Sequence, residues 1–302
     1  MLDITLIGTG GALPLKDRFL SSCIMKYNGA NFLFDCGEGT QISLRRQKIS
    51  LSRINTILIT HCHADHVSGL PGLLLSMGND MRTEPVTLIG PAGFARILHS
   101  LLIIARELPF ELNIIELKHA HESFSIDGCK IDAFRVDHSI SCYGYTLEIE
   151  RVGKFSPEKA SLNGVPMKAW GLLQKDEQVE FDGKIYTRDM AFEKARRGIK
   201  VLFCTDTRPL TVISDMAKGA DLMICEGMFA EDAKVCRAEE TKHMTFVEAA
   251  RLAKTAMPDE LWLTHFSPSL PDPHNYISVA TNIFQNTVCG TDGMYKEIKF
   301  KD

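Results

Sequence analysis

The sequence predicts an α/β fold in which sheets are covered by helices. Short apolar and β-branched runs recur along all 302 residues, and helical patterns fall between many of them. The first half is rich in strands that look hairpin-like, whereas the second half alternates strand and helix. This mixture is typical of sheets that carry helices on their faces, and the chain is long enough to bury a large core.

The expected elements follow from these periodicities. Strands are expected at 2–7, 22–27, 31–34, 55–59, 86–89, 112–117, 131–136, 144–149, 200–204, 221–225 and 260–264. Helices are expected near 39–48, 69–78, 93–106, 189–197, 210–218, 245–256 and 274–286. Residues 151–188 break the rhythm, because they are polar and basic and contain two prolines. We therefore predict one domain over 1–302 with 151–188 as an insertion, although an ordinary long surface connection would also explain the segment.

Composition indicates a globular protein, at 45% hydrophobic and 24% charged residues. No apolar run approaches the roughly 18 residues that a membrane-spanning helix needs. The first eight residues lack a basic region ahead of a long apolar stretch, so they predict a strand and not a signal peptide. The nine cysteines are dispersed and form no CxxC pair. Reduced thiols and a cytoplasmic location are therefore expected.

The net charge of −4 gives no overall basic signature for nucleic acid. The charge is uneven, however, since residues 151–200 hold 11 Lys or Arg against 7 Asp or Glu. A basic segment on an acidic chain favours a local contact with a polyanion, and chance asymmetry explains the charge equally well.

Four good metal ligands, His61, His63, Asp65 and His66, directly follow the strand-like run 55–59. Ligands at a strand end lie at the rim of a sheet. His61 and His63 alternate, so an extended backbone points both to one side, while the adjacent Asp65 and His66 must point elsewhere. Two metals suit this pattern better than one, and the ligand types favour Zn²⁺, with Mn²⁺ or Fe²⁺ as alternatives. A metal-free cluster of surface histidines is the competing interpretation.

Three distant residues repeat the same form, an apolar strand, a polar residue and a ligand: His138, Asp206 and His265. Singly, each could be a core histidine or a capping aspartate. Together they predict a dinuclear centre. The favoured assignment places His61, His63 and His138 on one metal, places Asp65, His66 and His265 on the second, and lets Asp206 bridge both.

At this point the sequence resembles the metallo-β-lactamase superfamily and, within it, the ribonuclease Z family, whose members cut the 3′ trailer from precursor tRNA. The matching stretches are IGTGGALP (7–14), FLFDCGEGTQ (32–41), THCHADHVSGLPGLL (60–74), DHS (137–139), CTDTRP (204–209), ICEGMF (224–229), HMTFVEAARLAK (243–254) and LTHFS (263–267). The resemblance implies an αβ/βα sandwich of two packed sheets flanked by helices and, commonly, a homodimer. It also implies that segment 151–188 corresponds to an exosite arm that grips tRNA.

The implied reaction is attack on phosphorus by a hydroxide that two metals activate, which leaves a 3′-hydroxyl on the tRNA. Asp65 can ligate one metal and accept a proton from the attacking water. His243 matches the HxT position of the family and is the candidate general acid, or else a plain loop histidine. It precedes a capping box made by Thr245 and Glu248. Asp35 and Glu226 are candidate carboxylate partners for the ligating histidines.

Three segments depart from the family pattern: 14–22, where Phe19 replaces an asparagine, 167–169, and 268–270. None contains a ligand, but all lie in regions expected to meet substrate. They motivate an alternative, a hydrolase of small phosphodiesters or other esters with the same metal centre. A non-catalytic, metal-stabilised RNA-binding protein is a third possibility, against which the full set of seven ligands argues.

Overall fold

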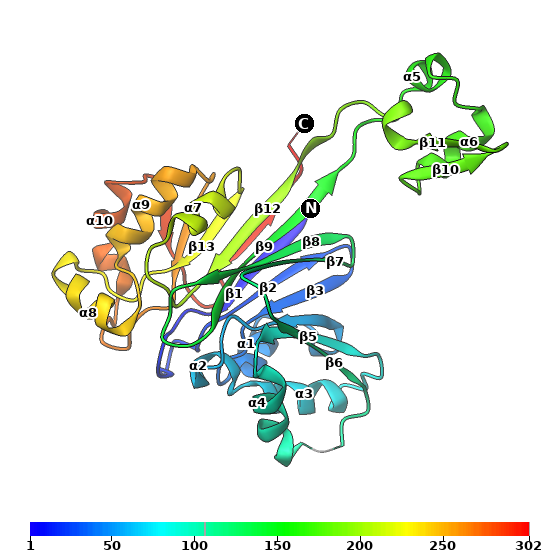
Figure 1. Cartoon of the computed structure of the whole chain (residues 1–302). Coiled ribbons are helices and arrows are strands. Elements are labelled where there is room, and N and C mark those ends of the chain that lie inside the picture. The colour runs from blue at the N-terminus through cyan, green and yellow to red at the C-terminus, as the bar shows by residue number, and fades with distance from the viewer. Residues whose placement is uncertain (106, 302) are drawn as a thin grey trace. The chain divides into compact units, whose positions relative to one another are not determined.

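The chain forms two compact units in the computed structural model, which describes residues 1–105 and 107–301 (Figure 1). The first unit comprises Met1–Glu148 and Ile199–Lys299. The second comprises Ile149–Gly198 with Phe300 and Lys301. None of the helices in these described ranges is long and apolar enough to cross a membrane.

The first sheet of the larger unit has seven strands. Its order is β16 (Tyr295–Ile298), β1 (Leu2–Gly8), β2 (Ser22–Tyr27), β3 (Ala30–Phe34), β4 (Ile54–Leu58), β5 (Val86–Pro91) and β6 (Leu112–Leu117). Pairing is antiparallel from β16 to β3 and parallel from β3 to β6. Helices α1 (Thr40–Arg46), α3 (Leu70–Asn79) and α4 (Phe94–Leu101) contribute apolar side chains to the core on its outer face. Because β3 and β4 run parallel, their carboxyl ends meet at one edge of the sheet, and the ligand-bearing segment begins there.

The second sheet also has seven strands. Its order is β15 (Thr287–Cys289), β14 (Leu261–Thr264), β13 (Leu222–Glu226), β12 (Arg196–Cys204), β9 (Cys142–Arg151), β8 (Cys129–Val136) and β7 (His121–Ile126). Helices α7 (Thr211–Ala217), α9 (Phe246–Ala256) and α10 (Ser278–Thr281) lie beside its parallel half (Figure 1). Strands β12, β13 and β14 run parallel, so their carboxyl ends meet at one edge.

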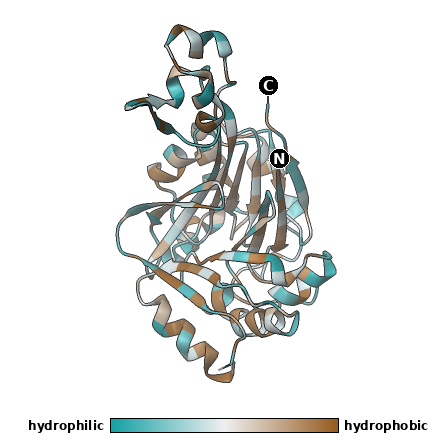
Figure 2. Ribbon diagram, turned by 90° about the vertical axis from the view of Figure 1, so that its right-hand side faces the viewer, coloured by the Kyte–Doolittle hydropathy of each residue, from teal (hydrophilic) through white to brown (hydrophobic). Residues whose placement is uncertain are grey.

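Aromatic side chains join the two sheets. The ring of Phe34 on β3 lies 6.0 Å from that of Tyr145 on β9 and 5.4 Å from that of Phe203 on β12. The Tyr145 hydroxyl donates to the main-chain carbonyl of Ile59 at 2.8 Å. Hydrophobic residues are concentrated along these central strands (Figure 2). The predicted α/β fold of two packed sheets flanked by helices is confirmed.

Some predicted helices are wrong or end early. The helix expected at 189–197 is a short 3₁₀ turn, Arg188–Met190, after which β12 begins at Arg196. A Cβ on Gly198 would lie only 2.1 Å from the carbonyl oxygen of Ile149, so close pairing with β9 overrides the helical period there. The helix expected at 93–106 gives way to a 3₁₀ turn at Leu102–Ile104, and its last predicted residue lies outside the described ranges. The helix expected at 274–286 is broken into Pro273–Tyr276 and α10.

The second unit has a hydrophobic core of its own. Its elements are α5 (Pro157–Leu162), α6 (Met167–Leu173), β10 (Gln178–Phe181) and β11 (Lys184–Thr187). The hydroxyl of Ser156 accepts from the Lys159 amide and caps α5, with Pro157 at the first helical position. The core residues are Ala160, Val165, Ala169, Leu173, Tyr186, Ala191 and Phe192. The segment predicted as an insertion therefore contains packed secondary structure.

Candidate metal centre

The motif THCHADH spans the change from strand to helix. His61 and His63 follow β4, with His63 in extended backbone, and Asp65 and His66 lie in α2 (Ala64–Val67). The turn from α2 into α3 (Leu70–Asn79) is packed tightly against the loop after β3, since a Cβ on Gly69 would lie 2.1 Å from the carbonyl oxygen of Gly37, and a Cβ on Gly37 would lie 2.4 Å from that of Asp65. These two contacts explain why FDCGEG and SGLPG each need a glycine.

The three distant candidates reach the same edge from the second sheet. His138 follows β8, Asp206 follows β12, and His265 follows β14. Asp206 and His265 adopt left-handed backbone, with φ of 51° and 57°. Such a conformation costs a non-glycine residue about 1 kcal/mol or more and is concentrated at functional sites. The chain turns sharply at each strand end and delivers the side chain to the rim.

Asp206 is shared between two groups of ligand atoms. His61, His63, His138 and Asp206 have ligand atoms within 4.8 Å of one another, and so do Asp65, His66, Asp206 and His265. The Oδ1 atom of Asp206 lies 3.2 Å from His66 Nε2 and 3.1 Å from His265 Nε2. Its Oδ2 atom lies 3.6 Å from His61 Nε2 and 3.9 Å from His138 Nε2. Each carboxylate oxygen therefore faces one group, as a bridging ligand must.

The electrostatics of the cluster fit cations. The ring nitrogens His66 Nε2 and His265 Nε2 face each other at 3.2 Å, and His61 Nε2 and His63 Nδ1 at 3.0 Å. The buried Oδ1 of Asp206 makes no hydrogen bond within the described residues. Burial lowers the pKa of His66, yet Asp206, Asp35 and Asp65 raise it well above its usual value. Converging lone pairs and a demand for positive charge suit a divalent metal, for which imidazole and carboxylate are the usual ligands.

Asp35 fixes the orientation of His66. It is fully buried in left-handed backbone, with φ of 56°. His66 Nδ1 donates to its Oδ2 at 2.8 Å, and the Thr60 main-chain N–H donates to its Oδ1 at 2.8 Å. Because Nδ1 carries the proton, Nε2 is left to face the second group. The expectation that Asp35 pairs with a candidate ligand therefore agrees with the geometry.

Glu226 binds His243 and none of the seven candidate ligands. His243 Nδ1 donates to Glu226 Oε2 at 3.2 Å, and the main-chain N–H groups of Met244 and Thr207 also donate to this carboxylate. Burial lowers the pKa of His243, but the charge and hydrogen bond of Glu226 outweigh it and raise the pKa to about 9. The imidazole of His243 lies 5.4 Å from that of His265 between ring centroids. A protonated histidine thus lies beside the cluster.

Arg208 is a further site residue that sequence reasoning did not single out. Its guanidinium donates to the main-chain carbonyl of His243 and forms a two-pronged pair with Glu248. Glu248 also accepts from the Thr245 N–H, and Thr245 accepts from the Glu248 N–H, which confirms the predicted capping box. The position of Arg208 two residues after Asp206, in TDTRP, was the available signal.

The loop after β1 completes the rim. The Ala12 main-chain N–H donates to Asp65 Oδ2 at 2.7 Å, with Ala12 in left-handed backbone at φ 63°. Desolvation raises the pKa of Asp65, but the charges and hydrogen bonds of His66 and His265 outweigh it, so that the pKa falls well below the usual range. Asp65 is therefore held as a carboxylate.

Comparison with known proteins agrees with this geometry. Residues 2–162 match the family model described as anti-Pycsar protein Apyc1, a stretch that holds five of the seven candidate ligands. The chain is 53% identical to ribonuclease Z of Lachnospira eligens, over 100% of this chain and 99% of that one. It is 52% identical to ribonuclease Z of Agathobacter rectalis, over the full length of both.

A solved structure extends the likeness to three dimensions. The short form of human tRNase Z superposes with a TM-score of 0.71 at 25% identity, covering 99% of this chain and 100% of the other. The ribonuclease Z relatives span the whole chain, including Asp206 and His265, which lie beyond the shorter family match. The chain therefore belongs to the ribonuclease Z family, the metal-dependent endoribonucleases with the metallo-β-lactamase fold.

Proposed function

We propose that this endoribonuclease removes the 3′ trailer of precursor tRNA and leaves a 3′-hydroxyl on the tRNA. The observation that carries the proposal is the pair of ligand groups sharing Asp206, in a chain that aligns end to end with ribonuclease Z relatives. His61, His63 and His138 would hold one metal, and Asp65, His66 and His265 the second, with Asp206 between them. We propose Zn²⁺, two ions per chain.

Divalent ions held there would polarise a phosphate oxygen and lower the pKa of water. Asp65, kept ionised, accepts the proton of the water that attacks phosphorus. The bond between phosphorus and the 3′ oxygen breaks, so the phosphate stays on the trailer. His243, which Glu226 keeps protonated near neutral pH, donates a proton to the leaving 3′ oxygen. The tRNA then ends in a hydroxyl.

We propose that segment 151–188 supplies a second contact with the tRNA. Lys168, Lys175 and Lys184 are exposed and make no ion pair within the described part of the chain. The core of this segment shares no residue with the hydrophobic clusters that contain α3 and α9 of the larger unit. Replacing 151–188 by a short glycine–serine linker should therefore weaken tRNA binding and leave hydrolysis of a small phosphodiester intact. Loss of both activities would argue against this role.

The alternative substrate is a small phosphodiester. The changed segments favour it, because Met167-Lys168-Ala169 begins α6 and Met167 is 75% exposed where the grip motif is expected. In that case the linker variant should match the wild type on every substrate.

A homodimer and a cytoplasmic location stay predictions; sedimentation analysis tests the dimer.

The deciding experiment is cleavage of precursor tRNA with a 3′ trailer, followed by mapping of both product ends. A metal-dependent cut near the discriminator base, lost in His61→Ala, is expected. Hydrolysis of bis(p-nitrophenyl) phosphate without any cut in precursor tRNA would overturn the proposed substrate and retain the metal centre.

A further inference from the structure

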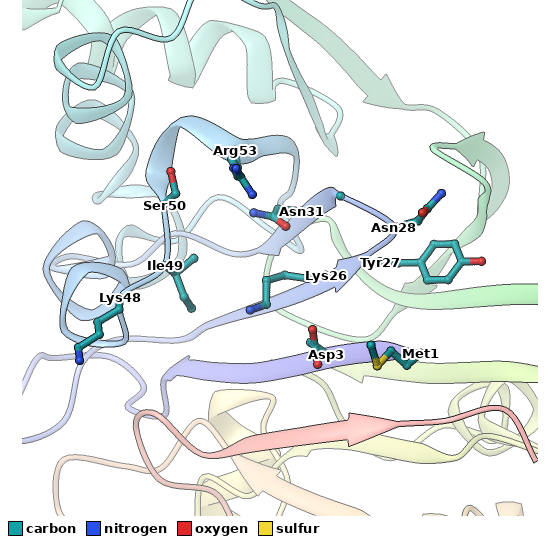
Figure 3. Close-up of a pocket in the computed structure, with 11 residues that line it drawn as sticks. Met1, Asp3, Lys26, Tyr27, Asn28, Asn31, Lys48, Ile49, Ser50 and Arg53 are labelled. Atoms are coloured by element: carbon teal, nitrogen blue, oxygen red, sulfur yellow. The ribbon is translucent and has the colours of Figure 1, made fainter.

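A polar hollow lies near the start of β3 and β4, at the ends opposite those that lead to the metal centre. Its volume is about 390 Å³, and its lining includes Lys26, Asn31, Lys48 and Arg53 (Figure 3). Asn31 precedes Asp35 by four residues on β3, which separates the two sites by about 13 Å along that strand. The hollow is therefore distinct from the metal centre.

The charge of the hollow is positive. Lys26, Lys48 and Arg53 make no ion pair within residues 1–105 and 107–301. The one lining carboxylate, Asp3, accepts a hydrogen bond from the Tyr295 hydroxyl at 2.6 Å. Three cations gathered around one concavity repel one another and focus a field that attracts anions, here on a chain whose net charge is −4.

Asn31 adds an unpartnered amide. The residue is 7% exposed, and its main-chain N–H donates to Asn55 Oδ1. Its side-chain amide makes no hydrogen bond with any described residue, although it lines the hollow between Lys26 and Arg53 in the view of Figure 3. The amide atoms are not buried away from solvent, so the amide opens into the hollow and can donate to a ligand there.

Lys48 occupies a position that favours glycine. It follows α1 in left-handed backbone, with φ of 56°, and its N–H donates to the carbonyl of Arg45. Helices commonly end on glycine in this conformation, because a side chain there carries an energetic cost. A lysine at this position is consistent with a binding role for its charge.

We propose that this hollow binds the phosphate group of a nucleotide. Lys26 and Arg53 would contact the phosphate oxygens, Asn31 would donate a further hydrogen bond, and Lys48 would add charge at the rim. The volume exceeds that of inorganic phosphate and suits a mononucleotide. The nucleotide could be free or part of an RNA chain. Binding of a free nucleotide does not depend on the proposed tRNA activity.

The test is calorimetric titration of the full-length protein with adenosine 5′-monophosphate. Arg53→Gln and Lys26→Gln should each raise the Kd at least about tenfold, the loss expected for one charge-assisted hydrogen bond. Arg96→Gln, an exposed arginine of α4 outside the hollow, is the matched control and should not change the Kd. His61→Ala should also leave it unchanged, which separates this site from the metal centre. Equal Kd values in the wild type and both hollow variants would overturn the proposal.

Two further variants and a second probe sharpen the test. Lys48→Gly should raise Tm, because glycine accepts the left-handed backbone, and should still weaken binding. A Kd unchanged in Lys48→Gly would remove Lys48 from the site. A six-nucleotide single-stranded RNA, titrated into His61→Ala to prevent cleavage, identifies the source. Tighter binding than the mononucleotide, lost with Arg53→Gln, indicates RNA, whereas weaker binding indicates a free nucleotide.

Discussion

Gly11 leaves room for the imidazole of His265. A Cβ at Gly11 would come within 2.5 Å of Cε1 and 2.7 Å of Nδ1 of that ring. Gly11→Ala should therefore displace His265, loosen one group of ligand atoms and lower kcat by about 10²-fold, a usual cost of misplacing a catalytic group by 1 Å. Steady-state cleavage and metal analysis would measure both effects.

The control for Gly11→Ala is Gly171→Ala. Gly171 lies in α6, and a Cβ there meets nothing within 4 Å. That variant should keep full hydrolysis of a small phosphodiester and gain about 1 kcal/mol of helix stability. If Gly11→Ala and Gly171→Ala had the same effect on hydrolysis, the close approach of Gly11 to His265 would not be needed for activity.

Asp206 should control occupancy of both metal positions. Asp206→Ala should lose most bound metal, since each of its oxygens faces a different ligand group. His138→Ala and His265→Ala should each lose about one equivalent, because each belongs to only one of the two groups that share Asp206. Elemental analysis after dialysis gives the ratios. Equal losses in all three variants would contradict a bridging role.

Asp35→Asn should weaken metal binding without removing a candidate ligand. The carboxylate that orients His66 becomes an amide, and loss of such a partner typically costs 10- to 100-fold in metal affinity. Asp132→Asn is the comparison, because Asp132 is also buried and hydrogen-bonded, to Ser123 and Thr146, but contacts none of the candidate ligands. A similar loss of affinity in both variants would show a general effect of burial.

Arg208 should act as a positioning residue for His243. Its pair with Glu248 is nearly buried, with side chains 13% and 11% exposed. Arg208→Ala should lower kcat more than it raises KM, and should lower the free energy of unfolding by about 3 kcal/mol. Arg208→Lys should restore part of kcat, since the main-chain carbonyl of His243 needs one donor only.

The pair Arg237–Glu240 offers the matched control. Its side chains are 65% and 67% exposed. Arg237→Ala should therefore cost less than about 1 kcal/mol and leave kcat unchanged. Comparable effects at Arg237 and Arg208 would rule out a positioning role for Arg208.

Strand-end ligands were the most predictable part of the site. Each follows a buried apolar run, so its place at the sheet edge can be predicted from local sequence. Strand β7 could not be predicted, because its residues alternate between exposed and half-buried and its pairing with β8 is set by tertiary contact. Strand β16 pairs with β1 from the far end of the chain, a long-range contact with no local pattern.

The polar connections around the ligands were also beyond local sequence. Glu226 was expected beside a ligating histidine and binds His243 instead, since β13 brings its carboxylate under the loop that carries His243 and Met244. Arg208 reaches Glu248 across 40 residues. Such partners depend on side-chain direction at strand ends, which periodicity does not specify.

The candidate ligands come from both sheets, four from the segment after β4 and three from the ends of β8, β12 and β14. Ions bound there would cross-link the two sheets of the sandwich. By mass action, the free energy of unfolding of the larger unit would then rise with the concentration of free metal. Metal starvation would expose this protein to unfolding and proteolysis, and so would reduce its abundance as well as its activity.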